Sequence, residues 1–301
     1  MAEVARLGID IGGTMIKAVG GRGARDRPGG ILDLEAARRL EVPTPTTRGG
    51  LIDAVSGLIE SLGGGEGPVG VASPGLAGRD NRSIHWMRGR LSAVEGLDWS
   101  AALGREAAVL NDAHAATLGE AWAGAAAGRS DVVMLTLGTG VGGGVICGGR
   151  LLQGATGRAG HLGHITLDLD GERDIVNTPG SLEDWVGNHT VAARTGFGST
   201  SELVAAVGRG EPAAEAHWDR TLHALACGVG SLINAFDPEV VVLGGGIAQA
   251  GEAALFGPLA EKLAEVEWRP TGSGVPVVPA ELGPWAGAVG AARFAETEFG
   301  V

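Results

Sequence analysis

Short apolar runs that end in glycine-rich turns are the most regular pattern in the chain. Apolar residues dominate 4–11 and 15–19, and a glycine pair at 12–13 separates them. Because glycine tolerates the backbone angles of a tight turn, the pattern predicts a strand, a turn and a second strand. The same pattern returns at 131–147, around a turn at 138–140. Two copies of one strand–turn–strand unit indicate an internal duplication.

The remaining segments alternate between helical and strand patterns. Apolar side chains recur at helical spacing in 49–62, and the alanine-rich stretch 113–126 is predicted to be helical as well. Residues 148–238 are expected to be mainly helical, and a closing helix starts near residue 285. Four more apolar runs are predicted to be strands, at 68–72, 107–110, 239–243 and 275–278.

This alternation predicts two α/β domains. A chain of 301 residues, of which 44% are hydrophobic and 19% charged, is long and apolar enough for two globular domains. We predict a small lobe of residues 1–111, to which the helix 285–301 returns, and a large lobe of residues 112–284. The ligands are expected in a cleft between the lobes.

Composition and charge exclude several classes of protein. A net charge of −12 argues against a nucleic-acid partner, because binding a phosphate backbone needs a basic surface. Cys147 and Cys227 form no CxxC pair, so neither a disulfide framework nor a cysteine zinc site is expected. The N-terminus lacks the features of a signal peptide, and no apolar run reaches the ~20 residues that span a bilayer. We therefore expect a cytoplasmic protein without a membrane partner.

The first glycine turn suits the binding of phosphate groups. Phosphoryl transfer needs positioned phosphates, a magnesium ion and a base beside the acceptor hydroxyl. The backbone N–H groups of Gly12 and Gly13 and the hydroxyl of Thr14 could bind phosphate oxygens. Asp10 before them could hold Mg²⁺ through water, and Lys17 after them adds a positive charge. Asp10 could equally be an ordinary residue at a strand end, so this turn alone leaves the question open.

The second turn can be compared with two nucleotide-binding motifs. Gly138, Gly140 and Gly143 satisfy G-x-G-x-x-G, which occurs at dinucleotide sites. That motif must open a helix, however, whereas residues 145–147 are predicted to continue as a strand. The P-loop pattern G-x-x-x-x-G-K-[ST] is absent from the sequence. The pattern therefore favours a hairpin turn in which Gly138, Thr139 and Gly140 bind phosphates together with the first turn.

Asn111 and Asp112 lie where a predicted strand meets a predicted helix, at the expected hinge. A carboxylate there can accept the proton of a hydroxyl that attacks the γ-phosphate. Aspartate is also an excellent helix cap, and most such residues only cap. The two phosphate turns on either side of it in the sequence favour Asp112 as the catalytic base.

Together these residues resemble the ROK family of sugar kinases, which has the sugar kinase/actin/Hsp70 fold, a ribonuclease H-like fold. The resemblance covers nearly the whole chain. It rests on five ordered motifs, which are DIGGT (10–14), Asn111-Asp112, LGTGVGGG (137–144), GGRLLQGATGRAGHLGH (148–164) and VVLGGGI (241–247). It implies ATP, Mg²⁺ and a hexose or amino-sugar acceptor. We also expect a homodimer or a higher homo-oligomer.

The family's motifs assign further residues by position. Adenosine contacts are implied for the loop Gly244, Gly245 and Gly246, and sugar contacts for Gly75, Asn111, Asp112, His164 and Glu183. A hexose needs several donors and acceptors in fixed places, which these residue types supply. Without the resemblance, Glu183 would be interpreted as an acidic residue at a helix start, and His164 as a packing histidine.

Two departures from the family pattern concern the sugar side. Where the family has AGE-x-GH this chain reads AGHLGH, so His161 replaces a carboxylate that contacts sugar. The family's zinc segment CxCGxxGCxE aligns with 174–183, and its cysteines are replaced by Asp174, Val176 and Ser181. The imidazole of His164 cannot make a four-coordinate site alone, so we predict no structural zinc. We disfavour another metal site built from the two histidines and Asp174.

Three other functions are alternatives. A repressor of the same family would need a DNA-binding domain ahead of the first phosphate motif. That motif, DIGGT, begins at residue 10, so a repressor is not expected. A catalytically silent sugar sensor would not need Asp10, Asp112 and both turns together. A kinase that uses polyphosphate is the third, although the loop 241–247 favours ATP. Glucose is the first choice of sugar, while His161 and the segment 83–90 could favour an N-acetylated hexosamine, mannose or fructose.

Overall fold

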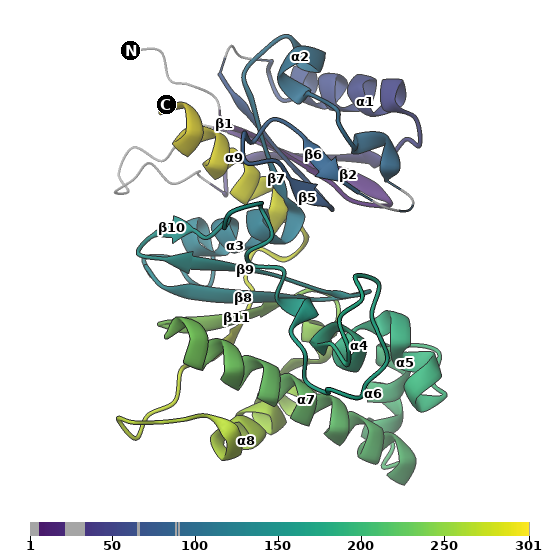
Figure 1. Ribbon diagram of the computed structural model, residues 1–301. Coiled ribbons are helices and arrows are strands. Elements are labelled where there is room, and N and C mark those ends of the chain that lie inside the picture. Colours follow the sequence, from purple (N-terminus) through teal and green to yellow (C-terminus); the bar gives the residue numbers. More distant parts are fainter. Residues whose placement is uncertain (1–5, 22–33, 65–66, 88, 90, 301) are drawn as a thin grey trace. The chain divides into compact units, whose positions relative to one another are not determined.

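Both predicted hairpins are present, one in each of two α/β units of the chain (Figure 1). The computed structural model describes residues 6–21, 34–64, 67–87, 89 and 91–300. The first unit contains Met1–Gly128, Leu151–Ala159 and Glu281–Val301, and the second contains Arg129–Arg150 and Gly160–Ala280. Each has one five-stranded sheet, and the α/β fold class is confirmed. The ligand cleft between the lobes and the lobe border after residue 111 stay predictions.

The sheet of the first unit has the strand order β3-β2-β1-β4-β7. β1 (Arg6–Ile11) and β2 (Met15–Gly21) form the hairpin, and β4 (Val69–Ser73) and β7 (Ala107–Asn111) continue from β1 in parallel. β4 and β7 are buried along their whole length, which is why uninterrupted apolar runs predict them. The sequence pattern does not predict β3 (Arg38–Pro43), because most residues of this edge strand are exposed.

Helix α9 (Ala286–Phe299) packs against this sheet and against α3 (Asp112–Ala123) through glycine positions. A Cβ at Gly70 would overlap Ala291 O, and a Cβ at Gly290 would overlap Ala115 O. Backbone can approach backbone so closely only where glycine stands. This contact joins α3 to the first unit, so residues 112–128 pack with it. The unit also contains α1 (Arg48–Ser61), η1 (Ser92–Val94), α2 (Trp99–Leu103) and the ribbon of β5 (Leu76–Ala77) and β6 (Ile84–Trp86).

The second unit repeats the same sheet. Its strand order is β10-β9-β8-β11-β12, and β8 (Val132–Leu137) and β9 (Val141–Cys147) form the hairpin. β11 (Val240–Gly244) and β12 (Val277–Pro279) continue from β8 in parallel, and β10 (Arg150–Leu151) lies at the other edge. Both sheets thus have a central strand, an antiparallel neighbour and two parallel strands in the same order. The predicted internal duplication is confirmed in its topology.

Helices make up most of the second unit after its hairpin, as expected. They are α4 (Leu182–Val186), α5 (Asn188–Thr195), α6 (Thr200–Gly208), α7 (Pro212–Phe236) and α8 (Gly257–Val266), with the short turns η3 (Ile247–Ala250) and η4 (Glu252–Phe256). Residues 160–181 of this unit differ, because they form loops and the short 3-10 helix η2 (Leu162–His164), and residues 152–159 of the first unit form a loop as well. Most of the motif 148–164 and most of the segment 174–183, which aligns with the family's zinc motif, lie in these loops.

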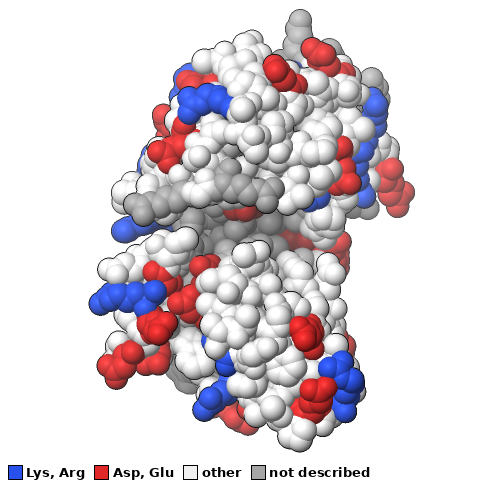
Figure 2. Space-filling view, turned by 90° about the vertical axis from the view of Figure 1, so that its right-hand side faces the viewer, with Lys and Arg blue, Asp and Glu red and all other residues white. Residues whose placement is uncertain are grey.

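The charged side chains are dispersed over the surface. Acidic residues outnumber basic ones, 35 to 23. On the face shown in Figure 2, the two signs are interspersed, and Lys and Arg do not gather into one continuous patch among the described residues. Within the described part of the chain, no helix is both long and apolar enough to span a bilayer.

Candidate active site

Three loops of the first unit leave its sheet at the same edge. In the parallel register, Ala72 of β4 lies beside both Asp10 of β1 and Leu110 of β7. Ligands of α/β proteins bind at the carboxyl ends of parallel strands. This edge carries Asp10 and the turn after it, Gly75 after β4, and Asp112 after β7. The sheet therefore brings the predicted residues of the first unit together.

Asp10 and Asp112 form a half-buried acidic pair. Burial raises the pKa of Asp10 to about 7, the charge of Asp112 adds to the rise, and Lys17, opposite Asp10 on β2, counteracts it. Burial also raises the pKa of Asp112, although its Oδ1 accepts a hydrogen bond from Ala113 N–H at 2.9 Å. A Cβ at Gly287, in the first turn of α9, would lie 2.5 Å from Asp10 Oδ2. With both carboxyls ionised, the pair would carry more negative charge than Lys17 compensates, which suits a bound cation.

Asn111, rather than Asp112, caps helix α3. Its Oδ1 accepts from the N–H groups of Ala113 at 2.9 Å and His114 at 3.2 Å. Its Nδ2 donates to Gly75 O at 3.0 Å, which uses one of its two hydrogens. Gly75 has a φ of +107°, a conformation that favours glycine. Asp112 is the first residue inside the helix. The capping role that the sequence offered as the alternative for Asp112 therefore belongs to Asn111.

The first glycine turn is anchored by Thr44. Gly12 N–H donates to Met15 O at 3.0 Å, while the Thr44 hydroxyl donates to Gly12 O at 2.7 Å. Thr44 N–H also donates to Thr14 O at 2.9 Å. Because the C=O and N–H of a trans peptide point in opposite directions, this anchor directs the N–H of Gly13 away from Thr44.

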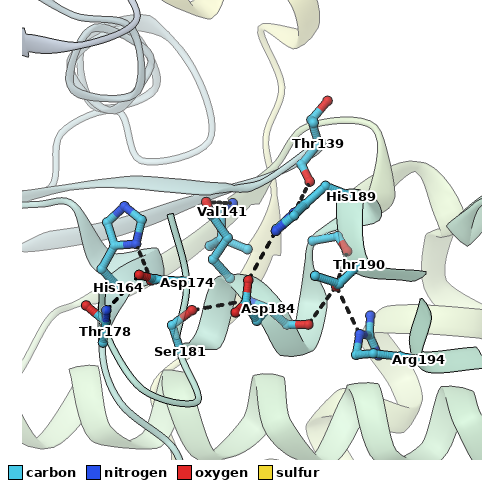
Figure 3. Close-up of polar contacts among 12 residues, drawn as sticks. Thr139, Val141, His164, Asp174, Thr178, Ser181, Asp184, His189, Thr190 and Arg194 are labelled. Carbon is cyan, nitrogen blue, oxygen red and sulfur yellow. Dashed lines mark hydrogen bonds and ion pairs between the residues drawn. The ribbon is translucent and has the colours of Figure 1, made fainter. Parts of the chain in front are cut away.

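In the second unit, the start of α5 holds the turn of Gly138, Thr139 and Gly140 from one side (Figure 3). Asn188 N–H donates to Gly138 O at 3.0 Å. His189 donates its N–H to Thr139 O at 2.9 Å, and its Nδ1 lies 2.8 Å from the same oxygen. By the same peptide geometry, the N–H groups of Thr139 and Gly140 point away from α5. Two adjacent N–H groups with one direction are what binding a phosphate oxygen requires.

Glu183 connects α4 to this turn. Its Oε2 accepts a hydrogen bond from Val141 N–H at 2.8 Å, and a Cβ at Gly140 would overlap the same oxygen. Ser181 caps α4 by accepting from Asp184 N–H at 3.3 Å. Glu183 stands in the first turn of α4, as expected of an acidic residue that interacts with the helix dipole. The contact with Val141 adds a second role, since it fixes the carboxylate beside the turn.

The loop of Gly244, Gly245 and Gly246 lies beside the same turn. β11 ends at Gly244, which lies opposite Thr136 of β8. Gly245 has a φ of +88°, and a Cβ there would overlap the carbonyl of Leu137, the residue before the turn. The two predicted nucleotide loops of this unit therefore leave its sheet at the same carboxyl edge.

The segment aligned with the family's zinc motif folds around Asp174. Its side chain has no exposed surface, and its Oδ2 lies 2.8 Å from His164 Nδ1. Its Oδ1 accepts from the N–H of Val176 at 3.0 Å and from the N–H of Thr178 at 2.8 Å, of which Figure 3 labels the second, and Ser181 adds a side-chain hydrogen bond. Burial acts to raise the pKa of Asp174, but these hydrogen bonds outweigh it and lower the pKa. N–H and O–H donors occupy the carboxylate of Asp174, so Asp174 and His164 do not fit a four-coordinate zinc site.

The alternative metal site of His161, His164 and Asp174, which the sequence disfavours, stays untested. The described residues contain no group of three or more His, Cys, Asp or Glu side chains arranged to hold a metal ion. His161 precedes η2, and its backbone oxygen accepts the N–H of His164 at 3.3 Å, so the two histidines start and end one short turn. The segment 83–90 belongs to the first unit and includes β6, and its residues 88 and 90 lie outside the described residues.

Sequence reasoning missed three supports of these loops, Thr44, His189 and Gly287. His189 contacts Thr139 through Nδ1 and Asp184 through Nε2, at 3.1 Å from Asp184 Oδ1 (Figure 3). Neither Thr44 nor His189 stands in a pattern that would mark it. Gly287 could have been noticed in the sequence, because it is the second residue of the small-residue run AGAVGAA (286–292), through which α9 packs.

Two sheets of one topology, each with a glycine turn between its first two strands, define the sugar kinase/actin/Hsp70 class of fold. The model of the ROK family matches residues 6–298, and the chain belongs to this family. The chain is a sugar kinase, and its relatives include a glucokinase and a ROK hexokinase.

The similar proteins include enzymes for two different sugars. Glucokinase of Thermotoga maritima is 31% identical over 333 aligned residues, with 100% of both chains covered. N-acetyl-D-glucosamine kinase of Vibrio atlanticus is 31% identical, over 80% of this chain and 84% of that protein. ROK hexokinase of Thermus thermophilus has a TM-score of 0.85 at 31% identity, over 98% and 99% of the two chains. ROK glucokinase of Streptomyces griseus, in complex with glucose and AMPPNP, has a TM-score of 0.75 at 28% identity, over 97% and 99%.

Proposed function

We propose that this protein transfers the γ-phosphoryl group of ATP to a hydroxyl of a hexose, with glucose as the first candidate and Asp112 as the general base. One observation carries the assignment of the base. Asn111 is the N-cap of helix α3, so the carboxyl of Asp112 lies at the carboxyl edge of the sheet with a single hydrogen bond to the helix start, from Ala113 N–H to Oδ1. Its raised pKa makes the carboxylate a stronger base than an exposed aspartate.

The reaction needs a single proton transfer by the protein. The ionised carboxylate of Asp112 accepts the proton of the sugar hydroxyl while the hydroxyl oxygen forms a bond to the γ-phosphorus. The bond between that phosphorus and the oxygen bridging to the β-phosphate breaks, and ADP leaves with the electron pair. Nearly all remaining catalysis is then positioning and charge stabilisation.

Backbone N–H groups are proposed to bind the phosphates. The N–H groups of Thr139 and Gly140 share one direction because α5 occupies the neighbouring carbonyls. The turn of Gly12, Gly13 and Thr14, with Lys17 beyond it, is the matching device on the first unit. The loop Gly244–Gly246 would contact adenosine. ATP as the donor is supported by the AMPPNP complex of the Streptomyces griseus relative.

Asp10 is proposed to hold Mg²⁺ through water. The fit rests on the acidic pair, because Asp10 has a pKa of about 7 that one neighbouring lysine does not bring down to its usual value. A divalent cation there neutralises charge that develops on the phosphate oxygens. Asp10 itself would orient a water ligand through its carboxylate, close to the first turn of α9.

The sugar contacts are proposed for Gly75, Asn111, His164 and Glu183, beside Asp112, with His161 in the position of the family's glutamate. The Asn111 side chain is held by its bond to Gly75 O and by a side-chain hydrogen bond with Asp112, and the Glu183 carboxylate is fixed through one oxygen. Glucose is supported by the glucokinase relatives, while the Vibrio relative keeps an N-acetylated hexosamine as the second candidate. The chain is also proposed to act as a homodimer or higher homo-oligomer.

The experiment is a coupled ADP-release assay across a panel of hexoses and hexosamines with Mg-ATP, repeated with polyphosphate as donor and ³¹P NMR of the product. Turnover of one or two sugars with ATP is expected, glucose first. Tight sugar binding without turnover of any sugar would identify a sensor instead. Faster turnover with polyphosphate than with ATP would reassign the donor.

A further inference from the structure

His164 is held in one tautomer by Asp174. The 2.8 Å contact joins His164 Nδ1 to Asp174 Oδ2, and an ionised carboxylate can only accept. The hydrogen of a neutral imidazole therefore lies on Nδ1, which leaves the lone pair on Nε2. Asp174 has no exposed side-chain surface, whereas 23% of the His164 side chain is exposed. Figure 3 shows the second ring nitrogen of His164 pointing away from Asp174, so the ring presents an acceptor on the side opposite Asp174.

The orientation of the Asp174 carboxylate is itself fixed by its loop. Two backbone N–H groups, from Val176 and Thr178, bind Oδ1, Ser181 adds a side-chain hydrogen bond, and Oδ2 faces the histidine. The loop is closed by Asp174 N–H donating to Thr178 O and by Asn177 N–H donating to Asp174 O, both at 2.9 Å. The carboxylate has no hydrogen to donate, so the ring donates to Oδ2, and the two backbone N–H groups determine which oxygen faces the ring.

From this geometry we infer that Asp174 is a positioning residue that fixes the tautomer of His164, so that His164 accepts a hydrogen bond from one hydroxyl of the sugar. The inference rests on the proposed role of His164 as a sugar ligand. It assigns a function to the residue that stands in the position of the first zinc cysteine, and it needs no metal. His164 would therefore select a sugar with a hydroxyl that donates to Nε2. A group that can only accept would face the lone pair of Nε2 and form no hydrogen bond.

One substitution reverses this direction without removing the contact. In Asp174→Asn the two backbone N–H groups still require an oxygen at the Oδ1 position, so the amide nitrogen takes the position of Oδ2. This nitrogen donates, and His164 Nδ1 must then accept. The ring hydrogen moves to Nε2, and the sugar meets a donor in place of an acceptor. Asp170→Asn is the matched control, because Asp170 is an exposed aspartate on the same loop.

The test combines long-range ¹H–¹⁵N NMR of ¹⁵N-histidine-labelled protein with kinetics on monofluorinated deoxy analogues of the preferred sugar. Fluorine replaces a hydroxyl but cannot donate. For the wild type and for Asp170→Asn, we expect the Nδ1–H tautomer and a KM about tenfold higher for one analogue than for the sugar. For Asp174→Asn, we expect the Nε2–H tautomer and a several-fold smaller ratio of these two KM values, with the KM for ATP unchanged. His164→Gln identifies the His164 signal by its loss.

The outcomes separate the inference from the proposed function. An Nδ1–H tautomer in Asp174→Asn, or an inverted tautomer with an unchanged ratio of KM values, overturns the inference while sugar phosphorylation stands. An equal rise in KM for sugar and all analogues also overturns it, because this is the result of a merely structural role. If the wild type phosphorylates no sugar, the proposed function fails, and the tautomer of His164 can still be determined by NMR. Retention of the sugar KM in His164→Gln would overturn the role of His164 itself.

Discussion

Replacing Asp10 with asparagine is expected to change how the stability of the metal-free protein depends on pH. The pKa of Asp10 rises from 3.8 to about 7 on folding, mainly through burial. The folded state therefore binds this proton more tightly than the unfolded state. Stability contributed by the protonated carboxyl is complete below pH ~4 and is lost as pH rises to ~7, where the buried group must ionise.

The magnitude follows from the same values. A rise from 3.8 to about 7 corresponds to an upper limit of about 4 kcal/mol between the two pH extremes. Asp10 is only half-buried, so solvent screening reduces this figure, and we take about half of it. Asp10→Asn removes the ionisation, so the stability of the variant relative to wild type should increase by about 1–2 kcal/mol between pH 5 and pH 8.

Urea unfolding at the two pH values, in the presence of a chelator, measures this increase. Asp53→Asn, which changes an exposed aspartate on α1, is the control and should show the same pH dependence as wild type. The reasoning is refuted if the stability difference between Asp10→Asn and wild type is the same at pH 5 and pH 8.

The other predictions concern packing, the second turn and zinc. Gly290→Ala should lower the free energy of unfolding by about 1–3 kcal/mol, because the new Cβ would overlap the backbone of α3. Gly57→Ala on α1 should raise the free energy of unfolding by about 0.5–1 kcal/mol, because a Cβ there meets no atom within 4 Å. Urea unfolding distinguishes the two, and equal effects would contradict the packing. Gly140→Ala should displace the Glu183 carboxylate and lower kcat/KM at least about tenfold, which steady-state kinetics measures. Metal analysis of the purified protein should find no stoichiometric zinc, and one zinc per chain would refute that prediction.

The repeated hairpins and the carboxyl-edge loops could be predicted because local patterns determine them. Buried strands such as β7 read as uninterrupted apolar runs, and glycine pairs mark the turns between strands. The edge strand β3 could not be predicted in this way, because its mostly exposed residues leave no apolar pattern.

The division of roles between Asn111 and Asp112 could not be predicted, because both residues are good caps. The difference depends on the Gly75 carbonyl, which holds the Asn111 side chain in the capping position from another loop. The role of Asp174 could not be predicted either. The sequence shows that the zinc cysteines are missing, but a loop conformation distant from any regular pattern decides which N–H groups bind the carboxylate.

The identity of the catalytic base is tested most directly by Asp112→Asn. The measurement is kcat for ADP release at saturating sugar and Mg-ATP, beside the affinity for sugar determined by calorimetry, with Asp53→Asn as the control. We expect kcat to fall at least about 100-fold while the sugar affinity changes little, since Asn111 still caps α3. Full activity of Asp112→Asn in the presence of normal sugar binding would contradict the assignment of Asp112 as the base.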